Sequence, residues 1–82
     1  MDNAAIAREL LSRARDMAAG DENLYRVRAY RQAAGAILRL DRPVCQLLAE
    51  TGLRGLQTLP GVGPSLAKTI AGLAQPELAS AR

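Results

Sequence analysis

Two prolines and two glycines stand within five consecutive residues, Pro60-Gly61-Val62-Gly63-Pro64, and this segment constrains the fold more than any other part of the chain. Pro60 presets a turn, and Gly61 supplies the positive φ that a type II turn requires at its third position. Pro64 suits the first position of a helix, because its missing N–H would have no intrahelical partner there. The segment therefore predicts a tight turn that leads directly into a helix.

The residues around this turn favour helices on both sides. Leu and Ala, both strong helix formers, dominate the apolar residues, and the chain has no Trp, no Phe and two Tyr. Val, Ile and Thr are sparse, so extended strands lack their usual material. We therefore predict an all-α fold, a compact domain of four to five helices. The 82 residues suffice for one domain, 1–82, which we expect to be the N-terminal domain of a longer protein.

Apolar residues recur at helical spacing in several stretches. We predict helices at 3–18 and 24–39, one or two turns that begin near Val44 and close at Thr51-Gly52, a short turn at 53–58, and a helix at 64–74. The predicted inner faces are Ile6, Leu10, Leu11, Ala14, Met17 and Ala18 in the first helix, Val27, Tyr30, Ala34, Ile37 and Leu38 in the second, and Leu66, Ala67, Ile70, Leu73 and Ala74 in the last.

Individual residues refine these predictions. Asp2 or Asn3 can cap the first helix with a side-chain oxygen, and Pro43 fits a first helical position. Gly35 costs its helix up to about 1 kcal/mol relative to Ala, so we expect close packing to require it. Cys45 lies in a Leu-rich turn and is expected to be a small buried residue.

Charge is distributed unevenly along a chain of formal net charge +3. Residues 1–22 carry three Arg against five acidic residues, a net of −2, whereas residues 23–42 carry five Arg against Asp41 alone, a net of +4. The remaining residues carry +1. Ten of the eleven cations are Arg, whose planar fork can bind two phosphate oxygens at once. A solvated surface and a patch that attracts polyanions are equally good interpretations of charge alone.

Composition also excludes several classes of protein. A single cysteine excludes an intramolecular disulfide, and together with the absence of His it makes a zinc site improbable. No apolar run reaches the roughly 20 residues that a membrane span needs, and the N-terminus lacks the layout of a signal peptide. We therefore expect a cytoplasmic protein without membrane partners and without a required cofactor.

The start of the last predicted helix has the features of an anion site. The N–H groups of Gly63, Ser65 and Leu66 would be exposed at the positive end of this helix. Ser65 adds a hydroxyl, and Lys68 adds a cation one turn along. This geometry suits a backbone phosphate, and phosphate contacts carry no direct sequence information. A Gly- and Pro-rich connection between any two helices would look similar, so Gly-X-Gly by itself is a weak signal.

Two stretches resemble a known family. Residues 59–70, LPGVGPSLAKTI, resemble the helix–hairpin–helix motif of DNA repair proteins. Residues 23–34, NLYRVRAYRQAA, resemble the second helix of the N-terminal lyase domain of family X DNA polymerases, the polymerase beta group. The resemblance covers roughly residues 3–75. It implies a four-helix fold that binds single-stranded or gapped DNA and recognises a 5′-phosphate end.

The resemblance also assigns roles to individual residues. It implies that Arg26 helps to hold the 5′-phosphate and that Tyr25 stacks on a base. Tyr30 would line the lyase pocket, although its place on the apolar face also makes it a core residue. The backbone carbonyls of Gln57, Leu59 and Val62 would ligate Na⁺ or K⁺ that bridges to a phosphate. Thr69 occupies the position of the family's Schiff-base lysine and has no amine for that chemistry.

These observations predict a sequence-nonspecific DNA-binding domain that acts on the sugar-phosphate backbone in repair or replication and is not an enzyme. Two alternatives remain open. The first is a 5′-deoxyribose-phosphate or abasic-site lyase that uses the amine of Lys68 or Met1. The second is a protein–protein adaptor that docks through the acidic first helix, where Ala4, Ala5 and Ala7 give a modest apolar face. A solvated role is the simpler interpretation for Arg28 and Arg39. The candidate DNA-binding residues are Gly61, Val62, Gly63, Ser65, Leu66, Lys68, Arg26, Tyr25 and Arg28.

Overall fold

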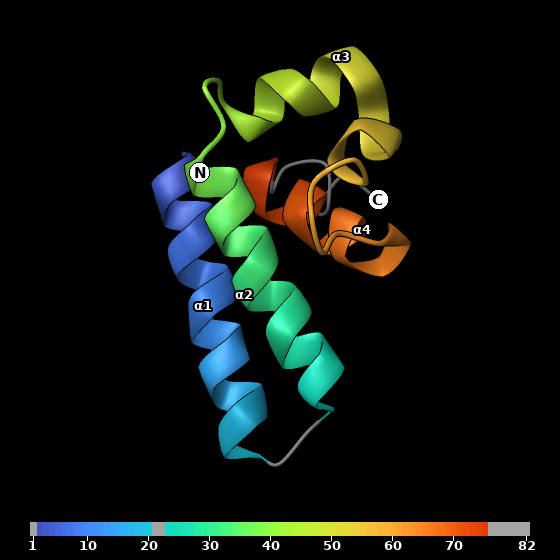
Figure 1. Ribbon diagram of the computed structural model, residues 1–82. Helices are drawn as coiled ribbons and strands as arrows, with labels where there is room; N and C mark the ends of the chain where they lie inside the picture. The colour runs from blue at the N-terminus through green and yellow to red at the C-terminus, as the bar shows by residue number, and fades with distance from the viewer. Residues whose placement is uncertain (1, 21–22, 76–82) are drawn as a thin grey trace.

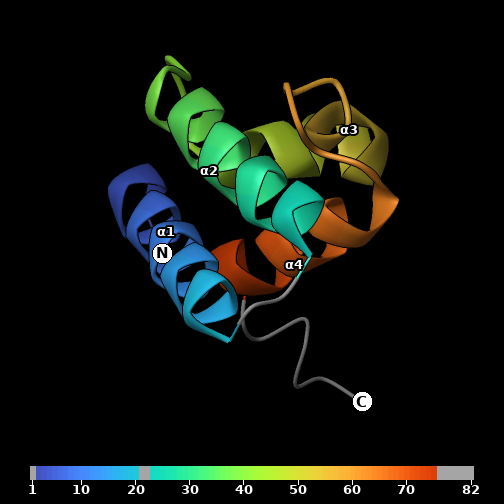
Figure 2. The ribbon, with the colours of Figure 1, turned by 60° about the horizontal axis from the view of Figure 1, so that its bottom comes forward.

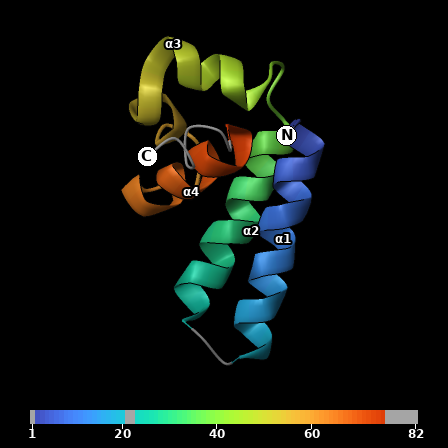
Figure 3. The same cartoon turned by 180° about the vertical axis from the view of Figure 1, so that it is seen from behind.

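Two antiparallel helices, α1 (Asn3–Ala19) and α2 (Leu24–Leu38), form one side of the computed structural model (Figure 1). Helices α3 (Val44–Leu56) and α4 (Pro64–Ala74) lie across the C-terminal part of α2 and are seen from behind in Figure 3. The structure describes residues 2–20 and 23–75, and within these ranges every regular element is a helix. The prediction of an all-α fold is confirmed. No helix in these ranges is long and apolar enough to cross a membrane.

The helix starts are fixed by short polar side chains. Asp2 is the N-cap of α1, and its carboxylate accepts a hydrogen bond of 2.8 Å from the N–H of Ala5. Asn23 caps α2 in the same way, through the N–H of Tyr25. Such a cap satisfies one of the N–H groups that the first turn leaves without an intrahelical partner. Of the two candidate caps for α1, the structure therefore selects Asp2.

Asn3 instead joins α1 to the connection between α2 and α3. Its Oδ1 accepts a hydrogen bond of 2.8 Å from the N–H of Val44, and its Nδ2 donates one of 2.8 Å to the carbonyl of Arg42. Pro43 is the N-cap of α3, with extended backbone angles (φ −63°, ψ 143°), and offers no side-chain cap. The prediction that Pro43 occupies the first helical position was wrong by one residue. Asn3 supplies the cap from another helix.

Helix α3 consists of two short helices joined at a bend, as the two predicted segments suggested. Gly52 has a φ of 67° and a ψ of −163°, a conformation that is essentially restricted to glycine. The bend turns the chain back toward α4 (Figure 1). Before the bend, Arg42 forms an ion pair with Glu50, and the hydrogen bond from Arg42 lowers the pKa of the Glu50 carboxyl.

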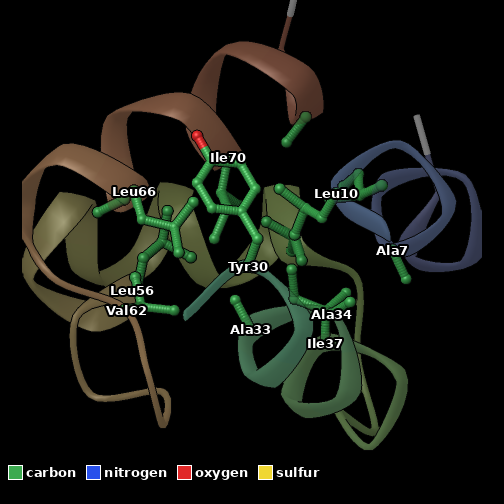
Figure 4. Close-up of a cluster of buried hydrophobic side chains, with 14 of the residues drawn as sticks. Ala7, Leu10, Tyr30, Ala33, Ala34, Ile37, Leu56, Val62, Leu66 and Ile70 are labelled. Carbon is green, nitrogen blue, oxygen red and sulfur yellow. The ribbon is translucent and has the colours of Figure 1, made fainter. Parts of the chain in front are cut away.

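The core is aliphatic except for one tyrosine. Tyr30 extends from α2 toward α4, where Leu66 and Ile70 lie (Figure 4). The inner faces predicted for α1, α2 and α4 are largely buried, and the exceptions lie at the edges of the apolar stripes. Leu38 is 58% exposed although α1 extends past it, as the hydrogen bonds of Asn3 to Arg42 and Val44 show, so its side chain lies outside the packed face of α2. The other residues that were predicted to face inward and are exposed are Leu11, Ala18 and Cys45.

The acidic first helix does not present one apolar outer face. Ala7 is 1% exposed and belongs to the core, whereas Ala4 is exposed and Ala5 is intermediate. The three alanines that suggested an adaptor surface therefore lie on different sides of α1.

Gly35 gives a test of how the helices are built. Its conformation is helical, and a Cβ placed on it would meet only the Arg39 Nη1, at an ordinary contact distance of 3.5 Å. We expect Gly35→Ala to raise the free energy of unfolding in urea by about 0.5–1 kcal/mol, because alanine loses less backbone entropy on folding.

Gly52→Ala is the matched control. A Cβ at Gly52 would meet nothing within 4 Å, yet its φ of 67° strains any other residue. We expect this variant to lose about 1–3 kcal/mol in the same urea titration. A loss of stability in Gly35→Ala would mean that α2 needs the glycine for packing after all.

Candidate functional site

The connection between α3 and α4 is a tight turn with one strained position. The N–H of Val62 donates a hydrogen bond of 3.1 Å to the carbonyl of Leu59, and Gly61 has a φ of 82°. Gly61 stands at the third position of this turn, where a type II turn requires a positive φ. The prediction made from the sequence for this residue is confirmed.

The turn, which we call the hairpin (residues 59–63), is seated directly on α2. A Cβ placed on Gly61 would lie 2.9 Å from the Oε1 of Gln32, 3.0 Å from its Cβ and 3.3 Å from the carbonyl oxygen of Ala29. Only a residue without a side chain fits there. The side chain of Val62 is 6% exposed and belongs to the core, so it fixes the hairpin from below. The hairpin can therefore offer a ligand only its backbone.

Helix α4 begins without a side-chain cap. Gly63 is its N-cap and Pro64 its first residue, and the carbonyl of Gly63 accepts the first intrahelical bond, from Ala67, at 2.9 Å. The N–H groups of Gly63, Ser65 and Leu66 donate no hydrogen bond to any residue that the structure describes. Three donors thus stand at the positive end of the helix dipole, the arrangement that favours an anion.

These donors border a hollow of about 200 Å³ between α2 and the hairpin. Arg26 and Tyr30 line it from α2, and none of the described residues that line it is acidic. The hollow brings Arg26, Tyr30 and the start of α4 together; its lining is mostly apolar, and the N–H groups and Arg26 give it a polar edge where an anion such as a phosphate group can bind. The residues that line it are Arg26, Ala29, Tyr30, Gly61, Gly63, Pro64, Ser65 and Leu66.

Five of the residues predicted for DNA binding line this hollow: Arg26, Gly61, Gly63, Ser65 and Leu66. Tyr25 and Arg28 do not. They line a second surface hollow, of about 230 Å³, together with Leu24, and Tyr25 is 82% exposed. Lys68 is exposed on α4, one turn beyond the donors, and does not line either hollow. Seven of the nine predicted residues therefore fall into two groups, one at each hollow, while Val62 is buried and Lys68 lies apart on α4.

The prediction that Tyr30 is a core residue is confirmed, and its place in a lyase pocket stays a prediction. Its side chain is 8% exposed within the core, and it also lines the hollow beneath the hairpin. Sequence reasoning missed Ala29 and Gln32, which lie against Gly61. Gln32 lies off the apolar face of α2. No local pattern in the sequence could have indicated that a turn 29 residues further on packs against it.

Three backbone carbonyls were predicted to hold a monovalent cation. The carbonyl oxygens of Gln57 and Val62 accept no backbone hydrogen bond from the described residues, and that of Leu59 accepts one, from Val62. Each carbonyl oxygen has two lone pairs, so all three retain the capacity to ligate a cation. Carbonyl oxygens are suitable ligands for hard cations, and binding of one cation by these three residues stays a prediction.

Thr69 lies beside Ser65 on α4. Its hydroxyl donates a hydrogen bond of 3.3 Å to the carbonyl of Ser65, within its own helix. Lys68 is one residue away, and one helical position rotates a side chain by about 100°. Because the Lys68 side chain is exposed, its amine lies outside the lining of the hollow.

A model of the helix-hairpin-helix domain family matches residues 1–75. The chain therefore belongs to the helix-hairpin-helix domain family, and such domains generally bind DNA without sequence specificity. Neither the search of curated proteins nor the search of solved structures found a match.

The two glycines of the hairpin allow fold and site to be tested separately. We expect Gly61→Ala to lose about 1–3 kcal/mol of stability, because its φ is strained for alanine and its Cβ would press on Gln32. Gly63 has a φ of −94°, and a Cβ there would meet nothing within 4 Å. Gly63→Ala should therefore stay within about 0.5 kcal/mol of the wild type in thermal and urea unfolding. Equal losses in the two variants would contradict this description of the turn.

Proposed function

We propose that this domain binds DNA through its sugar-phosphate backbone, with a phosphate held in the hollow between α2 and the hairpin. The observation that carries the proposal is the set of three N–H groups at the start of α4 that have no acceptor among the described residues, beside Arg26. Backbone donors and a cation recognise a phosphate whatever base is attached to it. The general DNA-binding role of the family supports the same conclusion.

The preferred DNA is single-stranded, gapped or 5′-phosphorylated, as in repair or replication intermediates. The exposed ring of Tyr25 supports this preference, because an unpaired base can stack on it while its phosphate enters the hollow beside Arg26. A single surface of this kind should bind with a Kd of about 10⁻⁴–10⁻⁶ M. The domain would then work through effective concentration, joined to further domains of the same protein.

Na⁺ or K⁺ would be held by the carbonyls of Gln57, Leu59 and Val62. A cation there supplies positive charge that can bridge the hairpin to a phosphate oxygen. The free carbonyl lone pairs support this role. The binding measurements below should therefore weaken when tetramethylammonium, which is too large to be ligated, replaces K⁺ at equal ionic strength.

Binding of labelled oligonucleotides by fluorescence anisotropy tests the proposal. We expect Gly63→Ala and Arg26→Gln each to weaken binding several-fold, since the first blocks close approach to the hairpin backbone and the second removes a phosphate contact. In Arg26→Gln the slope of log K against log salt should fall by about 0.7 for single strands. Removing the 5′-phosphate from the oligonucleotide should weaken the wild type more than it weakens Arg26→Gln.

Arg15→Gln provides the matched control, since Arg15 is exposed on α1 and lies in neither hollow. It removes the same charge from the protein. If it weakened binding as much as Arg26→Gln, binding would depend on net charge and the hollow would not be the site. If the wild type bound no DNA even at low salt, the DNA-binding proposal would fail.

We further propose that the domain binds without lyase chemistry. Thr69 supplies no amine, and Lys68 does not line the hollow. Borohydride should therefore not trap the wild type on DNA that carries a 5′-deoxyribose phosphate, whereas Thr69→Lys should become trapped, because it places an amine next to Ser65 at the hollow. Trapping of the wild type that disappears in Lys68→Ala would overturn this proposal.

A further inference from the structure

The side of α2 opposite its buried face carries a row of mostly polar residues that do not line the hollow. Arg28, Gln32, Gly35 and Arg39 follow one another at intervals of four, three and four residues, so they share one face of the helix. Arg31 lies beside this line. We call these five residues the outer stripe. It extends from Arg28 to Arg39, about 16 Å at the helical rise of 1.5 Å per residue.

The outer stripe faces away from the rest of the domain. Figure 2 shows α2 between α1 on one side and α3 with the hairpin on the other. The buried residues of α2 are Val27, Tyr30, Ala33, Ala34, Ala36 and Ile37, which occupy the opposite face. All members of the stripe are exposed except Gly35, which is intermediate. Among the described residues, the hairpin packs against Gln32 at the edge of the stripe, and the three arginines are exposed.

The charge of the outer stripe is uncompensated. Helix α2 contains no acidic residue, and Arg28, Arg31 and Arg39 form no ion pair with any described residue. In contrast, Arg13 on α1 pairs with Glu9, and Arg42 pairs with Glu50. Three guanidinium groups on one helix face repel one another, which favours a polyanionic partner that neutralises them.

Gly35 provides an independent observation at the centre of the stripe. The fold was expected to require this glycine for close packing, but a Cβ there would meet only the guanidinium of Arg39. Glycine within a helix is unfavourable, and nothing in the domain packs against this one. A bare helix surface does, however, let an external backbone approach closely.

The outer stripe also adjoins the hairpin. Gln32 belongs to the stripe and is at the same time the residue on which Gly61 is seated. A strand that leaves the hollow on this side therefore passes from the hairpin onto α2. An acidic protein segment would also match the charge, but this direct continuity with the hairpin favours DNA.

We propose that the outer stripe is a second DNA-backbone contact surface, which takes the strand that continues beyond the phosphate in the hollow. This inference rests on the proposed function and extends it. Arg28, Arg31 and Arg39 bind phosphate oxygens through their planar forks, the Gln32 amide donates a hydrogen bond, and Gly35 lets the strand lie close to the helix. At 3.4 Å per phosphate along one strand, the stripe spans about five phosphates.

The test compares two variants on two oligonucleotides by fluorescence anisotropy. Arg28→Gln/Arg39→Gln removes two charges from the outer stripe, and Arg8→Gln/Arg15→Gln removes two from the outer face of α1, where both residues are exposed. The short probe is a 5′-phosphorylated dinucleotide, whose strand ends before it can follow the stripe, and the long probe extends the same sequence to about thirty nucleotides. Thermal unfolding verifies that each variant is folded.

We expect the stripe variant to bind the long probe about tenfold more weakly than the wild type, with a salt slope lower by about 1.4. It should bind the short probe within about twofold of the wild type, and the α1 variant should resemble the wild type on both probes. Gly35→Gln keeps the charge and adds bulk, so it should weaken long-probe binding while its melting temperature stays at or above that of the wild type.

The outcomes separate this inference from the proposed function. If the wild type binds neither probe, the proposed function fails and the inference fails with it. If the wild type binds both probes but the stripe variant matches the α1 variant on the long probe, only the inference is overturned. The outer stripe would then be a candidate surface for a protein partner. Equal weakening on the short and long probes would also overturn it, because the stripe would then not act as a separate surface.

Discussion

The seating of Gly61 on α2 is the contact on which the rest of the site depends. The hairpin approaches Ala29 and Gln32 so closely that no side chain fits between them, and Val62 fills the core directly beneath. This contact sets the position of Gly63 and therefore the point at which α4 begins. Because α4 starts there, its uncapped N–H groups stand beside Arg26, a residue more than thirty positions earlier in the chain. A turn that is local in sequence thus becomes a site only when it meets α2.

The chemistry of the hollow follows from using backbone groups as donors. Backbone N–H groups are fixed by the turn and by the first turn of α4, so ordering them on binding costs little conformational entropy. They also read only the phosphate, which is consistent with the general behaviour of helix-hairpin-helix domains. The side chains around them differ in exposure: Tyr30 is held in the core, whereas Arg26 and Tyr25 are exposed. Donors that the backbone fixes in place suit a ligand with a constant backbone and variable bases.

The sequence predicted those features that depend on local backbone chemistry. The positive φ of Gly61, Pro64 at the first position of α4 and the uncapped donors all follow from the constraints on proline and glycine. The helices and most core faces follow from apolar spacing. What could not be predicted depends on how distant segments meet: Asn3 caps α3, and Gln32 supports the hairpin. Exposure at the edge of an apolar stripe was also mispredicted, since periodicity places Leu38 beside the buried Ile37 without showing which side chains the neighbouring helices cover.

Gly35 shows how a stability argument can point to function. Proteins commonly keep residues that are unfavourable for the fold where binding requires them. At such positions the residue lowers the stability of its helix or strand, and no contact within the domain makes up for the loss. Gly52 and Gly61 are explained by their positive φ, but Gly35 is helical and open. Gly35 lies among three arginines that form no ion pair with any described residue, and a partner bound there would explain why the unfavourable glycine is kept. Two weak backbone surfaces on one rigid helix act on the same strand, so contact at the hollow raises the local concentration of phosphates at the outer stripe. A domain of this size can gain affinity for longer DNA in this way without enlarging either surface.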